Sequence, residues 1–362
     1  MDNFAAIKTL FEDTSRLVDV KKEGILLEST ILGFESLGVF NPAAIRVGSD
    51  VHLFYRAVRE GNFSTIGYCR LDGPLQIAQR NTMPILIPQH PYESQGMEDP
   101  RIVNIDGTYY LTYTAYDGAN ALGALATSTD LVKFHKMGII VPEIDFKRFR
   151  DLVECGCVVN PKYFREHQDY AIRGLMRPNL RMWDKNIVFF PDRINGKLAF
   201  LHRIRPGIQI VFADEVPATL THEFWVDYLL CFSDHIVMEP RYAHESSYIG
   251  AGCPPIATDR GWLLIYHGVE DSPDGYRYHA CAALLDKENP KKELARLSRP
   301  LFSPEFEWER VGVVNNVVFP TGTALFGDRL YIYYGAADCR VAVASVNIQQ
   351  LLAALSAPHA SA

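Results

Sequence analysis

A short sequence motif, which we call the phrase, is repeated along this 362-residue chain, and polar and ionisable side chains recur at one position of it. The phrase is a Pro-containing turn followed by an aromatic, β-rich run, as in Glu98-Asp99-Pro100-Arg101 before the run from Thr108 to Tyr116. The corresponding corners carry carboxylate, cationic, imidazole, amide and phenol groups: Asn41, Arg56, Glu98, Asp99, Arg101, Lys185, Asn186, His202, Arg203, Tyr248, His267, Tyr278 and Asp338. Carboxylates hydrogen-bond to sugar hydroxyls, whereas Arg and Lys bind phosphate. These residue types predict a site for a polyhydroxylated ligand and for an anionic group.

The phrase occurs five times, and the repetition predicts the fold that would position those side chains. The turns are Asn41-Pro42-Ala43, Glu98-Asp99-Pro100-Arg101, Phe190-Pro191-Asp192-Arg193, Cys253-Pro254-Pro255 and Phe319-Pro320-Thr321-Gly322. Repeated β-rich units of about four strands are typical of propeller blades. We therefore predict an all-β fold, a five-bladed β-propeller, in which the equivalent corners of the blades converge on a central channel.

The predicted catalytic propeller spans residues 21–347, with short helices in residues 1–20 and 348–362, where apolar residues have helical spacing. A strand at Ile25 to Leu32 precedes the first complete blade, and we expect it to close the ring by pairing with the last blade. Two insertions, at 142–183 and 213–245, do not follow the blade rhythm. Their aromatic and apolar content argues against full disorder, and we expect them to cover the rim or to form a subunit contact in a homo-oligomer.

The net charge and the composition of the chain exclude several classes of partner. A formal net charge of -7 leaves no basic stripe for a nucleic acid. No apolar stretch approaches the roughly 20 residues of a membrane span, and the N-terminus lacks the features of a signal peptide. The seven cysteines include a single close pair, Cys155 and Cys157, so we expect reduced thiols rather than a metal site. The sequence predicts a cytoplasmic protein with no metal or organic cofactor and no nucleic-acid or membrane partner.

Each candidate side chain also has a purely structural interpretation. Asp99 precedes a proline and could brace a turn. The cations Lys185 and Arg203 could form surface ion pairs, and the histidines and tyrosines could be core residues. Recurrence at the same phase of different repeats favours function, because chance placement would scatter these groups.

In order along the chain, the motifs resemble those of glycoside hydrolase family 130. They include Asn41-Pro42-Ala43, Tyr55-Arg56-Ala57, Glu98-Asp99-Pro100-Arg101, Asp184-Lys185-Asn186, Leu201-His202-Arg203, Pro254-Pro255-Ile256, Ile265-Tyr266-His267-Gly268 and Tyr333-Tyr334-Gly335-Ala336-Ala337-Asp338. The resemblance covers roughly residues 30 to 347. It implies a five-bladed propeller that acts on β-mannosides, as a phosphorylase or as a β-mannosidase.

The resemblance also implies roles for matching positions. Asp99 matches the general acid, which in the phosphorylases is thought to protonate the glycosidic oxygen through the mannose 3-hydroxyl. A second set matches or adjoins the residues that hold the mannose: Asn41, Arg56, Glu98, Arg101 and Asp338. A third set matches the residues that surround inorganic phosphate, the implied co-substrate: Lys185, Asn186, Arg203, His267 and Tyr278. The implied products are α-mannose 1-phosphate, formed with inversion, and the released sugar.

One position departs from the family pattern. Tyr248-Ile249-Gly250 stands where the family usually has Lys-Ile-Gly, so a phenol replaces one cation of the expected phosphate site. A hydrolase would need a carboxylate base for water, and Glu245 or Glu270 could supply it. A non-catalytic sugar-binding propeller is a further alternative. Because Arg203 and His267 are kept, the sequence favours a phosphorylase over a β-mannosidase.

Overall fold

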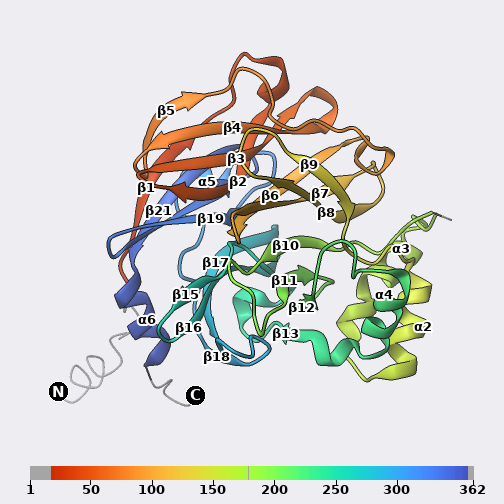
Figure 1. The fold of residues 1–362 in the computed structure, drawn as a ribbon. Coiled ribbons are helices and arrows are strands. Elements are labelled where there is room, and N and C mark those ends of the chain that lie inside the picture. Colours follow the sequence, from red (N-terminus) through yellow and green to blue (C-terminus); the bar gives the residue numbers. More distant parts are fainter. Residues whose placement is uncertain (1–17, 178, 358–362) are drawn as a thin grey trace, which may run out of the picture.

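The computed structural model describes residues 18–177 and 179–357, and the chain there is mostly β-strand (Figure 1). The helix expected in the first 20 residues lies largely outside the described part. The expected C-terminal helix is present as α6 (Ile348–Ser356), where Ile348, Leu351, Leu352 and Leu355 are buried. Among the described residues, no helix has the length and apolar character needed to cross a membrane.

The strands form five antiparallel groups. The first two are β2 (Gly38–Val47), β3 (Asp50–Arg59), β4 (Phe63–Asp72) and β5 (Gln76–Arg80), then β6 (Gly96–Ile105), β7 (Thr108–Tyr116), β8 (Ala121–Ser128) and β9 (His135–Ile139). A single parallel bridge, from Ser64 to Gly96, joins these two groups into one eight-stranded sheet. The third group is β10 (Lys185–Phe189), β11 (Leu198–Arg203), β12 (Ile208–Ala213) and β13 (Ile236–Met238).

The fourth group is β14 (Tyr248–Ala251), β15 (Ile256–Thr258), β16 (Gly261–Ser272), β17 (Gly275–Leu285) and β18 (Glu293–Arg296). The fifth is β19 (Val318–Phe326), β20 (Arg329–Ala336), β21 (Arg340–Asn347) and β1 (Val20–Leu27). The expected pairing of an N-terminal strand with the last group is confirmed, because β1 pairs antiparallel with β21. This strand ends at Leu27, however, and not at the predicted Leu32.

Successive groups contact one another in chain order, mostly through their first strands. Strand β2 contacts β6, β6 contacts β10, and β10 contacts β14; β16 and β17 contact β19, and β19 contacts β2. Residues that are far apart in the sequence but lie on these inner strands are therefore neighbours in space.

Three of the Pro-containing phrases, those with Pro42, Pro100 and Pro320, lie within first strands, whereas Pro191 follows β10 and Pro254 follows β14. The pairing register shifts between Phe40 and Ala43 and between Glu98 and Arg101, as at a β-bulge. Asn41 and Asp99 occupy the left-handed region at these positions, with φ of 50° and 47°. Asn186, with φ of 56°, lies at a further register shift, between Lys185 and Val188. Asn and Asp tolerate this region better than most residues, and a bulge re-aims the side chain that it carries.

A buried carboxylate precedes the first strand of each group and binds a side chain on that group's second strand. The pairs are Glu35 with Tyr55, Glu93 with Tyr113, Asp184 with His202, Glu245 with Tyr266 and Glu309 with Tyr334, at 2.5–3.0 Å. We call these five acids the carboxylate girdle. A cation from a further strand pairs with each of the four glutamates: Arg80, Lys136, Arg296 and Lys22. The next residue of each second strand points to the opposite face, and these residues include Arg56, Arg203 and His267.

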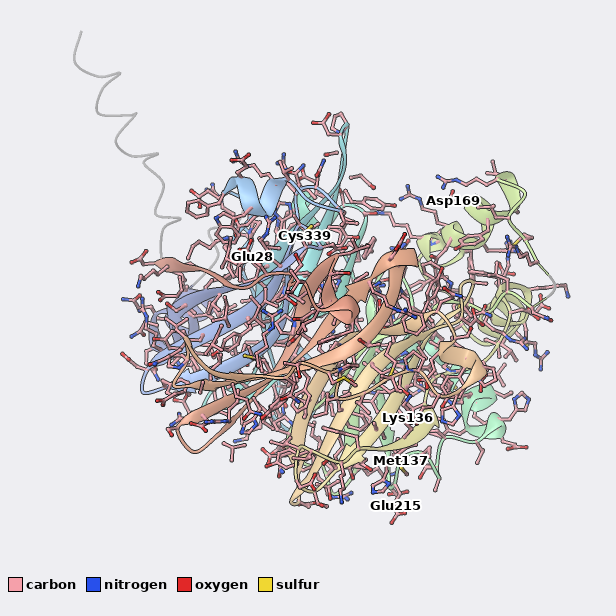
Figure 2. The ribbon with its side chains drawn as sticks, turned by 90° about the horizontal axis from the view of Figure 1, so that it is seen from above. Glu28, Lys136, Met137, Asp169, Glu215 and Cys339 are labelled. Atoms are coloured by element: carbon pink, nitrogen blue, oxygen red, sulfur yellow. The ribbon has the colours of Figure 1, made fainter. Side chains whose placement is uncertain are left out.

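The two insertions fold together beside the third group. They contain α2 (Phe146–Gly156), α3 (Arg165–Ile172) and α4 (His222–Leu230), with 3-10 turns η4 (Pro161–Phe164), η5 (Phe232–His235) and η6 (Ala243–Glu245). Phe149 and Tyr163 of the first insertion pack edge-on against Phe232 of the second, at centroid distances of 5.5 and 5.1 Å. Apolar residues of both insertions thus pack into one core cluster. Figure 2 shows Asp169 on this helical part, which lies to one side of the sheets.

The remaining short elements connect strands. They are η1 (Gly33–Glu35), η2 (Glu60–Asn62), η3 (Pro91–Glu93) and α5 (Glu307–Arg310). Three of them carry the girdle residues Glu35, Glu93 and Glu309.

Candidate active site

Asp99 lies at the centre of a set of polar contacts that bring together three strand groups. Asn41 Nδ2 donates to Asp99 Oδ1 at 2.7 Å, and Arg56 Nη1 lies 3.8 Å from the same oxygen. Arg101 Nη1 donates to the backbone carbonyl of Asp99 at 2.7 Å, while Arg101 Nε donates to the carbonyl of Gly252. Arg101 therefore braces the bulge that presents Asp99.

Glu98 joins two further predicted residues to this set. Its carboxylate pairs with Arg56 at 2.7 Å and lies 3.7 Å from Lys185 Nζ. Lys185 Nζ also lies 4.7 Å from the centroid of the Trp183 ring. Lys185 was expected among the phosphate residues, but its recorded ion pair is with the carboxylate side of the site.

The environment shifts the pKa values of two carboxyl groups, those of Asp99 and Asp338, in opposite directions. Burial opposes ionisation of Asp99, but Arg56, Arg101, the Asn41 hydrogen bond and Lys185 together hold its pKa below the usual range. Burial and the negative charge of Asp99 raise the pKa of Asp338 to about 7. Near neutral pH Asp99 is therefore ionised in the unliganded protein, and the proton that the pair retains resides on Asp338. Asp99 must take up a proton before it can act as an acid.

Arg203, His267 and Asn186 form a second cluster. Both Asn186 Nδ2 and Arg203 Nη1 lie 3.4 Å from His267 Nε2. Because both neighbours are donors, Nε2 accepts and the ring proton is assigned to Nδ1. Gly250 pairs with His267 across the sheet, and a Cβ there would lie 2.6 Å from the imidazole and 2.7 Å from Asn186 Nδ2. Glycine at 250 thus permits the close approach of these side chains.

Two phenols border this cluster. The hydroxyls of Tyr248 and Tyr278 are 2.6 Å apart, and the guanidinium of Arg203 lies 5.0 Å from the centroid of the Tyr248 ring. The Tyr278 and His267 rings are 6.4 Å apart. The structure therefore brings five predicted phosphate-site residues together: Asn186, Arg203, Tyr248, His267 and Tyr278.

The second cluster has more buried donors than acceptors. Arg101 Nη2, Arg203 Nε and His267 Nδ1 are buried and have no hydrogen-bond partner among the described residues. Burial and the neighbouring Arg205 lower the pKa of Arg203, and burial with the arginines Arg203, Arg101 and Arg205 lowers that of His267 well below its usual value. A neutral imidazole beside clustered guanidinium groups can donate to an anion, which is the partner that this donor set lacks.

Phe319 connects the two clusters and was not among the predicted site residues. Its ring lies 4.5 Å from the His267 ring and 6.1 Å from that of Tyr278, and the Arg101 guanidinium lies 5.6 Å from its centroid. The signal was present in the sequence, because Phe319-Pro320 stands at the same phase of the repeat as Glu98-Asp99-Pro100. The carboxylate side and the cationic side therefore form one continuous site.

Glu245 and Glu270 lie away from this site. Glu245 is completely buried in the girdle, where it accepts from Tyr266 Oη at 2.5 Å and pairs with Arg296 at 3.1 Å. Glu270 Oε2 lies 3.2 Å from His279 Nε2. Because alternate residues of a strand point to opposite faces, Glu270 lies across the sheet from His267. This geometry gives no support to either glutamate as a base for water.

His202 also belongs to the girdle and not to the site. Its Nδ1 contacts Asp184 and its Nε2 contacts the Tyr228 hydroxyl, both at 2.7 Å. The structural interpretation of this histidine, a satisfied core residue, is therefore confirmed.

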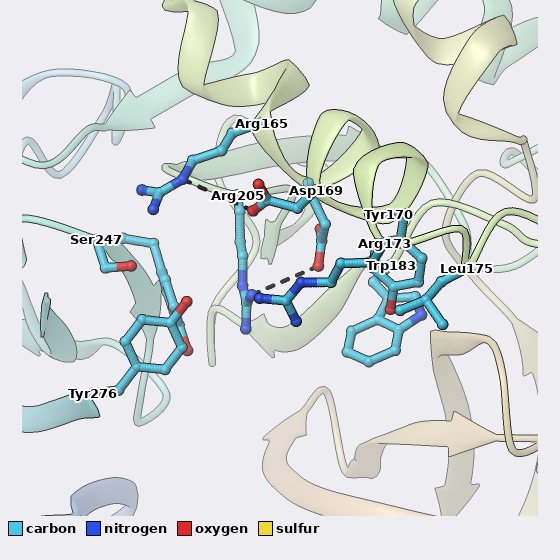
Figure 3. Close-up of a pocket in the computed structure, with 11 residues that line it drawn as sticks. Arg165, Asp169, Tyr170, Arg173, Leu175, Trp183, Arg205, Ser247 and Tyr276 are labelled. Atoms are coloured by element: carbon cyan, nitrogen blue, oxygen red, sulfur yellow. Dashed lines mark ion pairs between the residues drawn. The ribbon is translucent and has the colours of Figure 1, made fainter. Parts of the chain in front are cut away.

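A pocket of about 240 Å³ opens beside the cationic cluster, between helix α3 and the fourth strand group (Figure 3). Apart from Tyr248, it is lined by residues that the sequence analysis did not select, among them Glu166, Tyr170, Arg173, Trp183, Arg205 and Tyr276. Arg205 could have been noticed from its spacing, two residues after Arg203. The residues of α3 carry no comparable signal, because they lie in an insertion without repeat phase.

The comparisons with known proteins agree with the geometry. The profile of a protein family described as beta-1,4-mannooligosaccharide phosphorylase matches residues 29–357. The chain belongs to glycoside hydrolase family 130. This confirms the resemblance inferred from the motifs.

Two relatives of this family 130 chain come from Thermoanaerobacter sp. (strain X514), and each is 31% identical to it. One is named 1,2-beta-oligomannan phosphorylase and the other beta-1,2-mannobiose phosphorylase; each match covers 93% of this chain and 99% of the relative. A solved structure, beta-1,2-mannobiose phosphorylase from Listeria innocua with beta-1,2-mannobiose, superimposes with a TM-score of 0.70 at 22% identity. That match covers 93% of this chain and 99% of the other, and it shows a shared fold.

Proposed function

We propose that this protein is an inverting β-mannoside phosphorylase. It transfers a terminal β-linked mannose to inorganic phosphate and yields α-mannose 1-phosphate. A phosphate oxygen forms a bond to the anomeric carbon as the glycosidic C–O bond breaks on the opposite face. The leaving oxygen takes up a proton, and the acid is reprotonated by the proton released from monohydrogen phosphate or from solvent.

The observation that carries the proposal is the set of unpartnered buried donors on Arg101, Arg203 and His267. Phosphate is already anionic and nucleophilic, so a phosphorylase needs oriented donors and cations rather than a base. An inverting hydrolase needs a second carboxylate about 6.5–9.5 Å from the acid. The two glutamates proposed for that role, Glu245 and Glu270, bind girdle and histidine partners instead.

The proposed roles follow the two sides of the site. Asp99 is the proton donor, acting through the mannose 3-hydroxyl, and Arg101 positions it. The mannose lies among Asn41, Arg56, Glu98 and Asp338. Phosphate lies against Asn186, Arg203, His267, Tyr248 and Tyr278. Lys185 stands between the two sides, and its contacts with Glu98 and Trp183 support a role in holding the sugar as well as in attracting phosphate.

We further propose that the five strand groups are the blades of a five-bladed propeller, with residues 21–347 as one catalytic domain. The contacts that run from β2 through β6 and β10 to β14, and from β16 and β17 to β19 and back to β2, support this arrangement. So does the pairing of β1 with β21, which leaves the last group with four strands.

The decisive experiment incubates the protein with β-mannobiose in the presence and absence of inorganic phosphate. Both the β-1,2 linkage, which appears in the names of two relatives, and the β-1,4 linkage should be tested. We expect phosphate-dependent cleavage with α-mannose 1-phosphate as the product. Equal rates without phosphate, with free mannose as the only mannosyl product, would identify a β-mannosidase instead. Absence of turnover with every mannoside, together with binding, would identify a sugar-binding propeller.

A variant localises the phosphate site within the same experiment. Arg203→Ala removes a buried guanidinium, and we expect the KM for phosphate to rise by about 10–100-fold, the range for a lost charged hydrogen bond. The matched control is Arg193→Ala, which removes an exposed arginine paired with Asp106. Unchanged phosphate dependence in Arg203→Ala would show that the proposed phosphate site is misplaced.

A further inference from the structure

Arg205 stands beside the position where the sequence lacks an expected cation. Its guanidinium lies 4.0 Å from the centroid of the Tyr248 ring, and that of Arg203 lies 5.0 Å from the same centroid. One phenol ring therefore supports two guanidinium groups, a favourable cation–π arrangement for both. Tyr248 is the residue that replaces the lysine of the family pattern.

The charges around this ring do not balance. Arg205 pairs with Glu166 of helix α3 at 3.6 Å, a separation longer than a close hydrogen bond. Within residues 18–177 and 179–357, no carboxylate forms an ion pair with Arg203. Two guanidinium groups thus face a single acid, and a bound anion would relieve the excess positive charge.

Arg205 is also accessible to a ligand, unlike Arg203. Its side chain is 28% exposed and lines the pocket of about 240 Å³, whereas Arg203 is buried. In Figure 3, Arg205 extends between helix α3, which carries Asp169, and the side of the pocket formed by Ser247 and Tyr276. An anion that enters through this pocket meets Arg205 before it reaches the buried donors.

We propose that Arg205 is a phosphate-binding residue that takes over from the lysine expected at position 248, and that Glu166 competes with phosphate for it. This inference rests on the proposed phosphorylase function. It gives the first insertion a specific role, because α3 carries the acid that tunes the affinity of the site for phosphate. Arg205 then supplies the positive charge that is missing at position 248, and the Tyr248 ring holds the Arg205 guanidinium in place.

The test compares two variants with opposite expected effects. Arg205→Ala should raise the KM for phosphate by about 10–100-fold, with a change below about 3-fold in the KM for β-mannobiose. Glu166→Gln frees Arg205 from its ion pair and should lower the KM for phosphate by about 2–10-fold. Arg205→Lys keeps the charge and should recover part of the affinity. The surface variant Arg193→Ala should match the wild type.

A second readout does not depend on turnover. Phosphate alone should raise the Tm of the wild type, because it binds the native state, and the shift should shrink in Arg205→Ala and grow in Glu166→Gln. The Tm without phosphate shows whether each variant is folded.

The outcomes separate this inference from the proposed function. A wild type that cleaves mannosides without phosphate would overturn both. A phosphate KM that rises in Arg203→Ala but stays within about 2-fold in Arg205→Ala would overturn the inference alone. A rise confined to the KM for β-mannobiose would assign Arg205 to the sugar and also overturn it. An increased phosphate KM in Glu166→Gln would show that Glu166 positions Arg205 and does not compete for it.

Discussion

Glu245 in the carboxylate girdle and Asp99 in the candidate active site are both acids with arginine neighbours in the interior, but their surroundings differ. Glu245 accepts from the backbone N–H of Arg241 at 2.7 Å and from Tyr266 at 2.5 Å, and it pairs with Arg296 at 3.1 Å. The Asp99 carboxylate has one close donor, Asn41, and an arginine at 3.8 Å. Burial, together with the charge of the nearby Asp99, raises the pKa of Asp338 to about 7.

The comparison shows that burial and charge do not by themselves mark a catalytic acid. In the girdle, every carboxylate contacts a hydrogen-bonding side chain on the second strand of its group. In the site, a carboxyl pair has too few donors for two negative charges, while the neighbouring cationic cluster has donors without acceptors. The site therefore differs from the girdle in two ways: its carboxylate side lacks hydrogen-bond donors, and its cationic side lacks acceptors.

The largest expected effect concerns the site. Asp99→Asn removes the proposed proton donor while it keeps the shape of the side chain, and turnover should fall by a factor on the order of 10²–10⁴. The Tm should change little, because the lost attraction to Arg56 is offset by the relief of repulsion with Asp338. Steady-state kinetics with β-mannobiose and phosphate, together with thermal unfolding, check both parts. A variant that keeps turnover within a few-fold of the wild type would contradict the assignment of the acid.

A substitution in the girdle should have the opposite effect and lower stability more than turnover. Glu245→Gln leaves the buried Arg296 without one of its counter-charges and should lower the free energy of unfolding by about 3 kcal/mol. The folded enzyme should keep most of its turnover below the unfolding transition. Chemical denaturation and kinetics at a low temperature measure the two effects separately.

The matched control is Glu270→Gln, because Glu270 is partly exposed and contacts His279 alone among its recorded partners. We expect near-wild-type stability and turnover. Loss of turnover in either glutamate variant at unchanged stability would revive the hypothesis of a carboxylate base for water.

A smaller effect should appear as a pH dependence of stability. The pKa of Asp338 is raised to about 7 from an unfolded value of about 3.9, so its contribution to stability is present at low pH and is lost as the pH rises through about 7. Asp338→Asn abolishes this titration. Relative to the wild type, the variant should gain about 1–3 kcal/mol in unfolding free energy between pH 5 and pH 8.

Unfolding curves of both proteins at these two pH values provide the measurement. Asp99 does not interfere, because its lowered pKa confines its own contribution to acidic pH. If the unfolding free energies of the wild type and Asp338→Asn differ by the same amount at pH 5 and pH 8, Asp338 is ionised throughout this range. The hypothesis that Asp99 and Asp338 retain a proton would then be wrong.

Much of the site could be predicted, because the position of a residue within a repeat can be read from the nearby sequence. Asn41 and Asp99 each directly precede the proline of the repeat, and each occupies a left-handed bulge on an inner strand. Asn186 occupies a similar bulge on β10 but does not precede a proline. Tyr266-His267 and Tyr55-Arg56 likewise stand at matching points, and alternation along a strand sends the two residues of each pair to opposite faces. His202 was misplaced at first, because sequence alone does not show that it takes the tyrosine position of the girdle.

The sequence by itself determined the family, the strand-rich repeat and the set of polar residues on the inner strands. These depend on spacing and alternation, which each segment carries without reference to the others. Only the tertiary structure decided which acids are saturated with partners, that Phe319 joins the two sides of the site, and that Arg205 shares the Tyr248 ring with Arg203. Such facts depend on distances between segments far apart along the chain, and the same side chain is structural or functional according to the partners that packing brings to it.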